Sequence, residues 1–230
     1  SKYGIGTFSK EAYEFVDFLK EAGQTYWQIL PLGPTGYGDS PYQSFSTFAG
    51  NPYYIDLEEL INQGLLTEKQ CEDCDWGGSK AYVDYEKVYL SRFAILKEAF
   101  KNSQVEENEE FQTFVKENDF WLPDYALYMA VKDFFEGRSW SEWDEDIRLR
   151  KPHAIEKYSK QLKEEILFYE FQQYLFTTQW QKLKEYANDK GIKIIGDIPI
   201  YVAFDSADTW ANPELFQLDE NGFPTGVAGC

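Results

Sequence analysis

Two distant segments of the chain repeat one order of elements: a helix with an apolar stripe, a glycine stop, a short apolar strand and a polar loop. In the first segment, residues 9–22 predict the helix, Gly23 ends it, and Tyr26–Leu32 forms the strand. In the second, an apolar stripe over residues 176–187 precedes the strand Ile192–Ile195, whose continuous apolar character predicts cover on both faces. A helix that feeds such a strand is the repeat of barrels and doubly wound sheets, so the fold class is α/β.

A polar loop follows each predicted strand, where the binding sites of both architectures lie. The loop after the first strand, residues 30–46, reads Leu-Pro-Leu-Gly-Pro-Thr-Gly-Tyr-Gly-Asp-Ser-Pro-Tyr-Gln-Ser-Phe-Ser. Its glycines and prolines fix the backbone, so its side chains can meet a ligand with little entropy left to lose. Its carboxylate, hydroxyl, amide and phenol groups suit a neutral polyhydroxylated ligand. A long surface loop with ordinary turn chemistry explains the same residues, and the sequence leaves both interpretations open.

Asp197 is the carboxylate that stands out in the second segment. It comes directly after the predicted strand and precedes Ile198 and Pro199, so its backbone is well constrained. A position at the carboxyl end of a strand favours a functional role. The alternative is an aspartate that makes turn hydrogen bonds.

The chain between the two segments is predicted to be mostly helical. Apolar residues recur at helical spacing near residues 57–61, 93–100 and 124–135, the last with Tyr125, Tyr128, Met129 and Lys132. Residues 105–118 predict a solvated connection or an exposed helix. An insertion of this length exceeds an ordinary barrel loop, which indicates a helical subdomain. The predicted divisions are a barrel segment (1–53), a helical insertion subdomain (54–165) and a second barrel segment (166–230).

Charge narrows the range of partners. Forty acidic residues against 22 basic ones give a net charge of -18, which disfavours nucleic acid and anionic membrane surfaces because phosphates would be repelled. No apolar run reaches the length of a membrane-spanning helix. Aromatic residues make up 18% of the chain, and those beyond the needs of a core suit the apolar faces of sugar rings.

The sequence predicts neither a cofactor nor a metal site. It contains no glycine-rich phosphate loop after a strand. Cys71 and Cys74 form an isolated Cys-x-x-Cys whose intervening acidic residues would raise the thiol pKa, and an odd count of three cysteines indicates free thiols of a reducing compartment. The single histidine, His153, lies in a charged connection and is interpreted as solvated, as is the acidic group Asp144–Asp146.

Three long motifs resemble the 4-alpha-glucanotransferases, the amylomaltases or disproportionating enzymes of glycoside hydrolase family 77. The first is the stretch 26–46 followed by Phe48-Ala-Gly-Asn-Pro-Tyr53. The second is Trp121-Leu-Pro-Asp-Tyr-Ala-Leu-Tyr-Met-Ala130, and the third is Ile194-Ile-Gly-Asp-Ile-Pro-Ile-Tyr-Val-Ala203 with residues 205–219 behind it. The motifs follow the family's order, and the resemblance is loosest over residues 68–118.

The resemblance implies a partial (β/α)8 TIM barrel that holds the second and third strands, with the large helical insertion between them. It also implies a retaining mechanism, in which two carboxyl groups about 5–5.5 Å apart attack the anomeric carbon and protonate the leaving oxygen. The hydroxyl of another glucan then intercepts the glycosyl-enzyme in place of water. The family's nucleophile and acid/base lie on later strands, beyond Cys230, so this chain alone is expected to be inactive.

The resemblance also assigns roles to individual residues. Asp197 matches an active-centre segment and is expected to be a supporting carboxylate. Ser40 and Tyr42 match positions that contact the donor sugar, and Tyr37 matches a second, surface glucan contact that Tyr85 joins on a weaker local match. Asp39 is a further candidate for substrate binding, although Asp39, Gln43 and Asn51 more readily hold the loop.

The expected substrates are malto-oligosaccharides and starch-like glucans, and the expected location is the cytoplasm. The oligomeric state stays open. An alpha-glucan hydrolase on a similar barrel is the alternative among enzymes. A non-catalytic glucan-binding module is the alternative from another class. Product analysis separates these three hypotheses.

Overall fold

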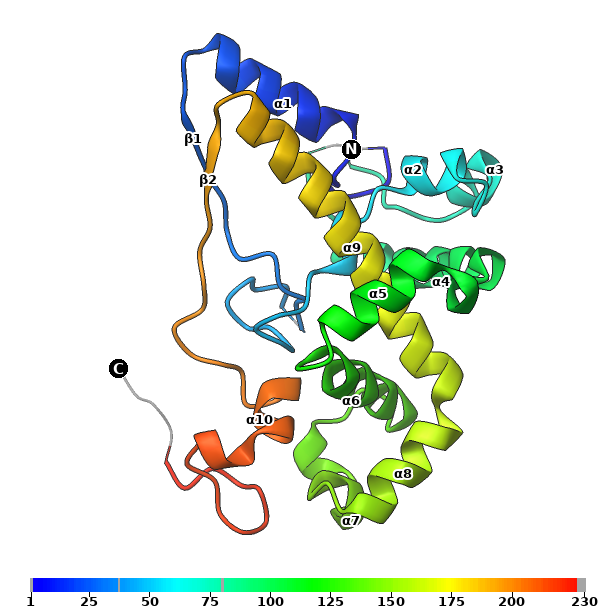
Figure 1. Ribbon diagram of the computed structural model, residues 1–230, viewed down its shortest axis with the longest axis vertical. Helices are drawn as coiled ribbons and strands as arrows, with labels where there is room; N and C mark the ends of the chain where they lie inside the picture. The colour runs from blue at the N-terminus through cyan, green and yellow to red at the C-terminus, as the bar shows by residue number, and fades with distance from the viewer. Residues whose placement is uncertain (1, 37, 80, 227–230) are drawn as a thin grey trace. The chain divides into compact units, whose positions relative to one another are not determined.

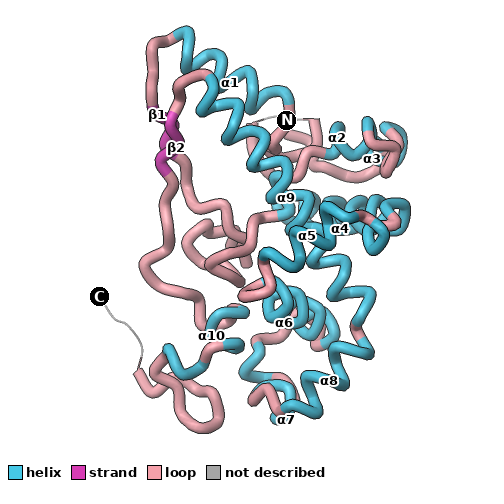
Figure 2. The backbone as a smooth tube through the Cα atoms, viewed as in Figure 1, coloured by secondary structure: helices cyan, strands magenta, loops and turns pink. Residues whose placement is uncertain are grey.

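The computed structural model describes residues 2–36, 38–79 and 81–226, which are mostly helical (Figures 1 and 2). The chain packs into two compact units, each assembled from three stretches of sequence. Unit 1 contains residues 1–32, 50–114 and 171–198, and unit 2 contains residues 33–49, 115–170 and 199–230.

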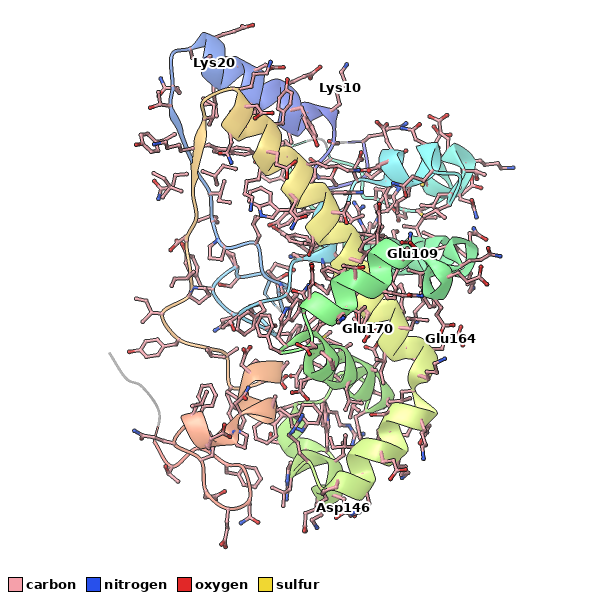
Figure 3. All side chains as sticks on the ribbon, viewed as in Figure 1. Lys10, Lys20, Glu109, Asp146, Glu164 and Glu170 are labelled. Atoms are coloured by element: carbon pink, nitrogen blue, oxygen red, sulfur yellow. The ribbon has the colours of Figure 1, made fainter. Side chains whose placement is uncertain are left out.

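Unit 1 holds both strands and the longer helices. Its elements are α1 (Lys10–Glu21), β1 (Tyr26–Gln28), the 3-10 turn η1 (Pro52–Tyr54), α2 (Leu57–Asn62), α3 (Glu68–Glu72), α4 (Tyr85–Ser103), the turn η2 (Val105–Glu107), most of α5 (Glu109–Glu117), most of α9 (Lys163–Asp189) and β2 (Lys193–Ile195). Charges at several ends suit the helix dipole, as with Lys20 in the last turn of α1 and Glu109 in the first turn of α5 (Figure 3).

The predicted pairs of helix and strand are confirmed. Helix α1 follows Ser9 and ends before Gly23, whose φ of 73° is easy only for glycine. Strand β1 pairs with β2 in parallel, with Tyr26 opposite Lys193. Strand β1 is shorter than the sequence predicts, since Pro31 has no N–H to extend the ladder.

The prediction that the second strand is covered on both faces is wrong for this structure. Burial along both strands alternates between exposed and intermediate, and Tyr26 and Ile195 are 55% and 45% exposed. In the part of the chain that the structure describes, the sheet has only these two strands. Two strands leave both edges open and offer too few neighbours to cover two faces.

The interior of unit 1 is built on α9. The ring of Phe176 lies 5.2 Å from that of Phe8, and Phe8 also contacts Trp180. Gly50 packs so closely on Phe176 that an added Cβ would lie 2.1 Å from its ring atoms. Glycine at this position therefore permits α9 to approach the backbone after the polar loop.

Unit 2 contains the remaining helices. They are α6 (Leu122–Phe134), the turn η3 (Trp140–Glu142), α7 (Glu145–Arg148), α8 (Pro152–Gln161), the first part of α9, α10 (Ala207–Ala211) and the turn η4 (Pro213–Leu215). Their core is aromatic: Tyr128 of α6 contacts Trp143 and Trp210, whose rings also meet each other edge to face. The polar loop 33–49 belongs to this unit.

The predicted helical character of residues 54–165 is confirmed. Helix α6 covers the predicted segment 124–135 within two residues at its start, and the region 105–118 forms η2 and α5. The division into segments 1–53, 54–165 and 166–230 stays a prediction.

Candidate functional site

The polar loop 33–49 closes on itself. Thr35 and Ser44 form an antiparallel bridge, and the backbone N–H of Phe45 donates to Pro34 O at 3.3 Å. Within this closure, Asp39 N donates to Gly36 O at 3.1 Å. The loop thus has a paired base, and its tip includes Gly36 and residues 38–43.

Three of the predicted site residues lie together at this tip. Asp39 has a left-handed backbone with φ of 51°, and its carboxylate accepts a long hydrogen bond of 3.5 Å from Thr35 Oγ1. Burial raises the pKa of Asp39, and the Thr35 hydrogen bond opposes that rise. The Ser40 hydroxyl accepts from Tyr42 N at 3.4 Å, and the Tyr42 side chain is 45% exposed. The tip therefore presents a hydroxyl and a phenol beside a carboxylate that helps to hold the loop.

Two serines that sequence reasoning missed support the base of the loop. Ser44 Oγ donates to Ser46 O at 2.7 Å, and Ser46 Oγ accepts from the N–H groups of Phe48 and Ala49 at 3.1 and 3.2 Å. Both serines are buried, and Gly33 leaves space for Ser44, whose Oγ would lie 2.6 Å from an added Cβ. In the sequence, the pattern Ser-Phe-Ser over residues 44–46 is the feature that could have pointed to these two serines.

Asp197 lies in unit 1, directly after Gly196 at the carboxyl end of β2, as the sequence predicts. Its side chain is exposed, and Oδ1 accepts a hydrogen bond from Ile198 N at 2.9 Å. The turn hydrogen bond and the strand-end position are both present, so the geometry is compatible with either interpretation of this residue.

The other predicted residues lie in unit 1 or outside the described residues. Tyr85 is the first residue of α4 in unit 1, is 40% exposed, and its ring centroid lies 6.4 Å from that of Tyr53. Tyr37 falls outside the described residues. Asn51 is buried, and its side chain accepts from Tyr53 N at 3.0 Å to cap η1, which is the holding role expected for it.

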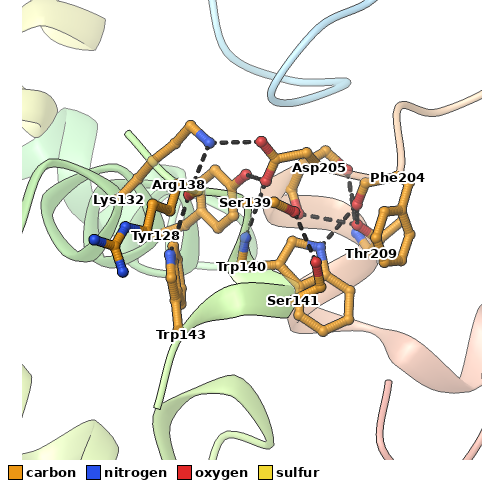
Figure 4. Close-up of polar contacts among 11 residues, drawn as sticks. Tyr128, Lys132, Arg138, Ser139, Trp140, Ser141, Trp143, Phe204, Asp205 and Thr209 are labelled. Atoms are coloured by element: carbon orange, nitrogen blue, oxygen red, sulfur yellow. Dashed lines mark hydrogen bonds and ion pairs between the residues drawn. The ribbon is translucent and has the colours of Figure 1, made fainter. Parts of the chain in front are cut away.

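A buried ionic network in unit 2 joins α6 to the segment before α10 (Figure 4). Lys132 Nζ lies 2.5 Å from Asp205 Oδ2 and donates to Arg138 O at 3.1 Å. The other carboxylate oxygen of Asp205 accepts from Tyr128 OH at 2.7 Å and from Trp140 N at 3.2 Å. Burial, and then Asp205, raise the pKa of Tyr128 well above its usual value. Sequence reasoning placed Lys132 on the right helix face but gave it no role.

A cavity of about 330 Å³ lies in unit 1, between α2, the end of α4, the start of α5 and α9. Glu59, Glu110, Phe171 and Tyr174 are among its lining residues. Tyr174 OH donates to Glu110 at 3.2 Å, and Lys182 pairs with Glu59 at 2.5 Å. None of the predicted site residues lines this cavity, and its lining residues Glu59 and Glu110 already have partners.

Both described cysteines are free thiols. Burial raises the pKa of Cys71 to about 11, with Cys74 as the next cause. The pKa of Cys74 is raised by burial and then by Asp73. The expected direction is thus confirmed, although burial rather than the acidic neighbours is the main cause. His153 is exposed and pairs with Asp146 at 2.9 Å.

In the described residues, no group of three or more histidine, cysteine, aspartate or glutamate side chains is arranged to hold a metal ion. Over the same ranges, no helix combines the length and the apolar character that a membrane crossing needs.

Comparison with known proteins identifies the family. All of residues 1–230 match the family described as 4-alpha-glucanotransferase. The chain is 51% identical to the 4-alpha-glucanotransferase of Clostridium butyricum and 49% identical to that of Thermus thermophilus, spanning 47% and 45% of those proteins. It thus covers about half the length of the curated relatives it matches.

A solved structure shows the same fold. The amylomaltase from Streptococcus agalactiae in complex with acarbose superposes with a TM-score of 0.95 at 44% identity, over all of this chain and 47% of that one. The match of the complete sequence and of the fold together lead to one conclusion: the chain belongs to the 4-alpha-glucanotransferase family.

Proposed function

We propose that this chain is a segment of an enzyme that transfers alpha-1,4-glucan segments between malto-oligosaccharides. The observation that carries the proposal is the paired polar loop 33–49, with Ser40 and Tyr42 at its tip, in a chain whose full length matches the family. Hydroxyl and phenol groups on an ordered loop suit the hydroxyls and apolar faces of a sugar. The relative from Streptococcus agalactiae, an amylomaltase, was solved with acarbose.

Ser40, Tyr42 and Asp39 act in this proposal as contacts to the donor glucan. Asp197 is a supporting carboxylate of the active centre, and Tyr37 and Tyr85 belong to a second glucan contact. The reaction is a retaining double displacement, whose nucleophile and acid/base lie beyond Cys230. The chain alone is therefore expected to be inactive. No cofactor takes part.

The fold proposed for this segment is part of a (β/α)8 barrel. Strands β1 and β2 would be its second and third strands, which is supported by their parallel pairing and by the helix that precedes each. Exposed apolar side chains on and after the strands, such as Tyr26, Leu30 and Ile195, are those that further barrel strands and helices would cover.

The proposed setting is the cytoplasm, without nucleic acid or membrane as a partner. The net charge of -18 and the free thiols Cys71 and Cys74 support this. Relatives in rice and Arabidopsis carry chloroplast or amyloplast names, so the compartment differs among members of the family.

The test is to incubate the full-length gene product with maltotriose and to separate the products by chromatography. Glucose together with longer maltodextrins establishes transfer. Glucose and maltose alone indicate a hydrolase, whereas unchanged maltotriose with saturable binding indicates a binding module.

Variants then test the residues. Asp197→Asn and Tyr42→Phe are expected to lower transfer, because each removes a polar group assigned to the active centre or donor site. Turnover by the purified 230-residue chain would contradict the placement of the nucleophile and acid/base beyond Cys230.

A further inference from the structure

The loop that carries Ser40 and Tyr42 is held at its base by α10. Ala207 N, at the start of that helix, donates to Phe45 O at 2.8 Å. Asp208, in the first turn, receives two hydrogen bonds from one residue of the loop: Thr47 N donates to Oδ2 at 3.0 Å and Thr47 Oγ1 donates to Oδ1 at 2.7 Å. The two atoms of Thr47 thus engage both oxygens of one carboxylate, which fixes orientation as well as position.

Helix α6 holds the same base from its own residues. The ammonium of Lys132 lies 5.2 Å from the centroid of the Phe45 ring, within the range of a cation–π contact. The ring of Phe48 stacks 6.0 Å from that of Trp121, the residue directly before α6. Asp205 in turn holds Lys132 in place. The two side chains form an ion pair of 2.5 Å in which the lysine is buried (Figure 4).

These contacts converge on residues 45–48, which follow the tip by only a few positions. All of them lie within unit 2, so the loop, α6 and α10 form one packed body. At the tip, Asp39 N donates to Gly36 O and Gln43 N donates to Ser40 O, both within the loop. The anchored base at residues 45–48 therefore carries the tip and helps to set its position.

We infer that Asp208, with the Lys132–Asp205 pair behind it, is a positioning residue that sets the glucan-contact loop in place for substrate. Part of the inference rests on the proposed function, because it assumes that the loop binds glucan. Its physical basis is preorganisation: an anchored tip loses less entropy when a sugar binds, and a released tip binds the same sugar more weakly.

The first test compares Thr47→Val with a matched control in the full-length gene product. Thr47→Val removes the hydroxyl that donates to Asp208 and preserves the size of the side chain. Thr113→Val is the control, because Thr113 Oγ1 donates to Glu109 O at 2.9 Å within α5. Hydrogen exchange over peptides spanning residues 33–49 is the readout that needs no activity. Exchange in these peptides is expected to quicken in Thr47→Val and to match the wild type in Thr113→Val.

Kinetics with maltotriose supply the second readout. Thr47→Val is expected to lower kcat/KM by roughly two- to tenfold, mainly through a higher KM, since a weaker hold on the loop costs binding more than chemistry. Ser40→Ala is then expected to cost less in the Thr47→Val background than in the wild type, because a loosened tip already presents Ser40 poorly. If the Thr47 contact had a purely structural role, the effects of Thr47→Val and Ser40→Ala on kcat/KM would be independent of each other.

The outcomes separate the inference from the proposed function. If the wild type shows no transfer, the proposed function fails, and hydrogen exchange alone decides the positioning role. Unchanged loop exchange in Thr47→Val overturns the inference, as do additive effects with Ser40→Ala. Should Thr47→Val lower the thermal midpoint of the whole protein, Asp208→Asn provides the second variant, since it retains one acceptor for Thr47 and the volume of the side chain.

Discussion

Among single residues, Arg92 is a buried charge that holds separate stretches of unit 1 together. It is fully buried on α4, and it donates to Ile55 O at 2.8 Å and to Tyr3 O at 3.4 Å. Its guanidinium also lies 5.2 Å from the centroid of the Trp76 ring. Burial lowers the pKa of Arg92 to about 10, so the residue stays charged at neutral pH. The side chain links three separate stretches of unit 1.

We expect Arg92→Leu to lower the free energy of unfolding by about 1–3 kcal/mol, because it leaves the carbonyls of Ile55 and Tyr3 buried without a donor. Chemical denaturation monitored by circular dichroism measures this change. The control is Arg138→Leu, whose guanidinium is exposed and pairs only at 4.0 Å with Glu136. Substitution of such an exposed side chain changes the free energy of unfolding by no more than about 0.5 kcal/mol. Equal effects of the two substitutions would contradict the role of Arg92.

Glu170 lies on α9 (Figure 3), and we expect it to make the stability of the protein depend on pH. Burial raises the pKa of Glu170 from 4.5 to about 7. Below pH 4.5 the carboxyl is protonated in both the folded and the unfolded chain. Between pH 4.5 and 7 the unfolded chain has lost this proton while the folded chain retains it, so raising the pH favours unfolding.

The expected loss of stability over this interval is about 1–2 kcal/mol, after allowing for solvent screening at a half-buried group. Glu170→Gln removes the titration and preserves the shape of the side chain. At pH 8 this variant is expected to unfold at a higher denaturant concentration than the wild type, and at pH 4.5 the two should be nearly equal. Parallel pH profiles for the two proteins would show that Glu170 ionises freely in the folded state.

Among the elements, α9 is bound to residues 50–56 by two of its glutamine side chains, which hydrogen-bond to the backbone there. Gln173 accepts from Gly50 N at 2.7 Å and donates to Gly50 O at 2.9 Å. Gln179 repeats the arrangement with Asp56, at 2.6 and 3.3 Å. Each amide thus pairs with both polar groups of one residue, as a neighbouring strand would. The two glutamines are six residues apart, which is about 120° around the helix, and both still reach the one segment 50–56.

We expect Gly50→Ala to break this fit. An added Cβ would lie 2.1 Å from the ring of Phe176, so the ring or the backbone must shift, at a cost of about 1–3 kcal/mol or more. Gly6→Ala is the matched control, since nothing lies within 4 Å of its added Cβ. Thermal unfolding of the two variants checks this, and a Gly50→Ala protein as stable as Gly6→Ala would refute the tight packing of α9.

The sequence predicted the positions of the helices better than it predicted which side chains are buried or paired. Helical spacing identified α1, α6 and α9, because an apolar stripe records which side of a helix is covered. The same patterns gave no sign that Arg92 is buried or that Lys132 pairs with Asp205. Those environments depend on partners 37 to 89 positions away in the sequence, two of them backbone carbonyls. The loop tip could be predicted from its turn chemistry, whereas its anchors Thr47 and Asp208, 161 positions apart, could not.

For the molecule as a whole, net charge and exposed apolar surface have opposite effects on self-association. The net charge is -18, while Ile198, Ile200 and Tyr201 after β2 are 80%, 92% and 69% exposed. We expect the 230-residue chain to stay dispersed at about 10 mM salt and to associate near 0.5 M, because the screening length falls from about 30 Å to a few ångströms. Light scattering across a salt series measures this. Scattering that falls as salt rises would mean that charge attraction drives association.

The pairing of β1 with β2 has a consequence for synthesis of the chain. Tyr26 leaves the ribosome long before Lys193, its partner 167 positions further on. At about 5–20 residues per second, β1 waits for roughly 10–30 s without its neighbour. Most of α2–α8, which lie wholly between the two strands, can form during that interval from local contacts. We therefore expect these helices to form before the sheet, so that pairing of β1 with β2 depends on helices that are already in place.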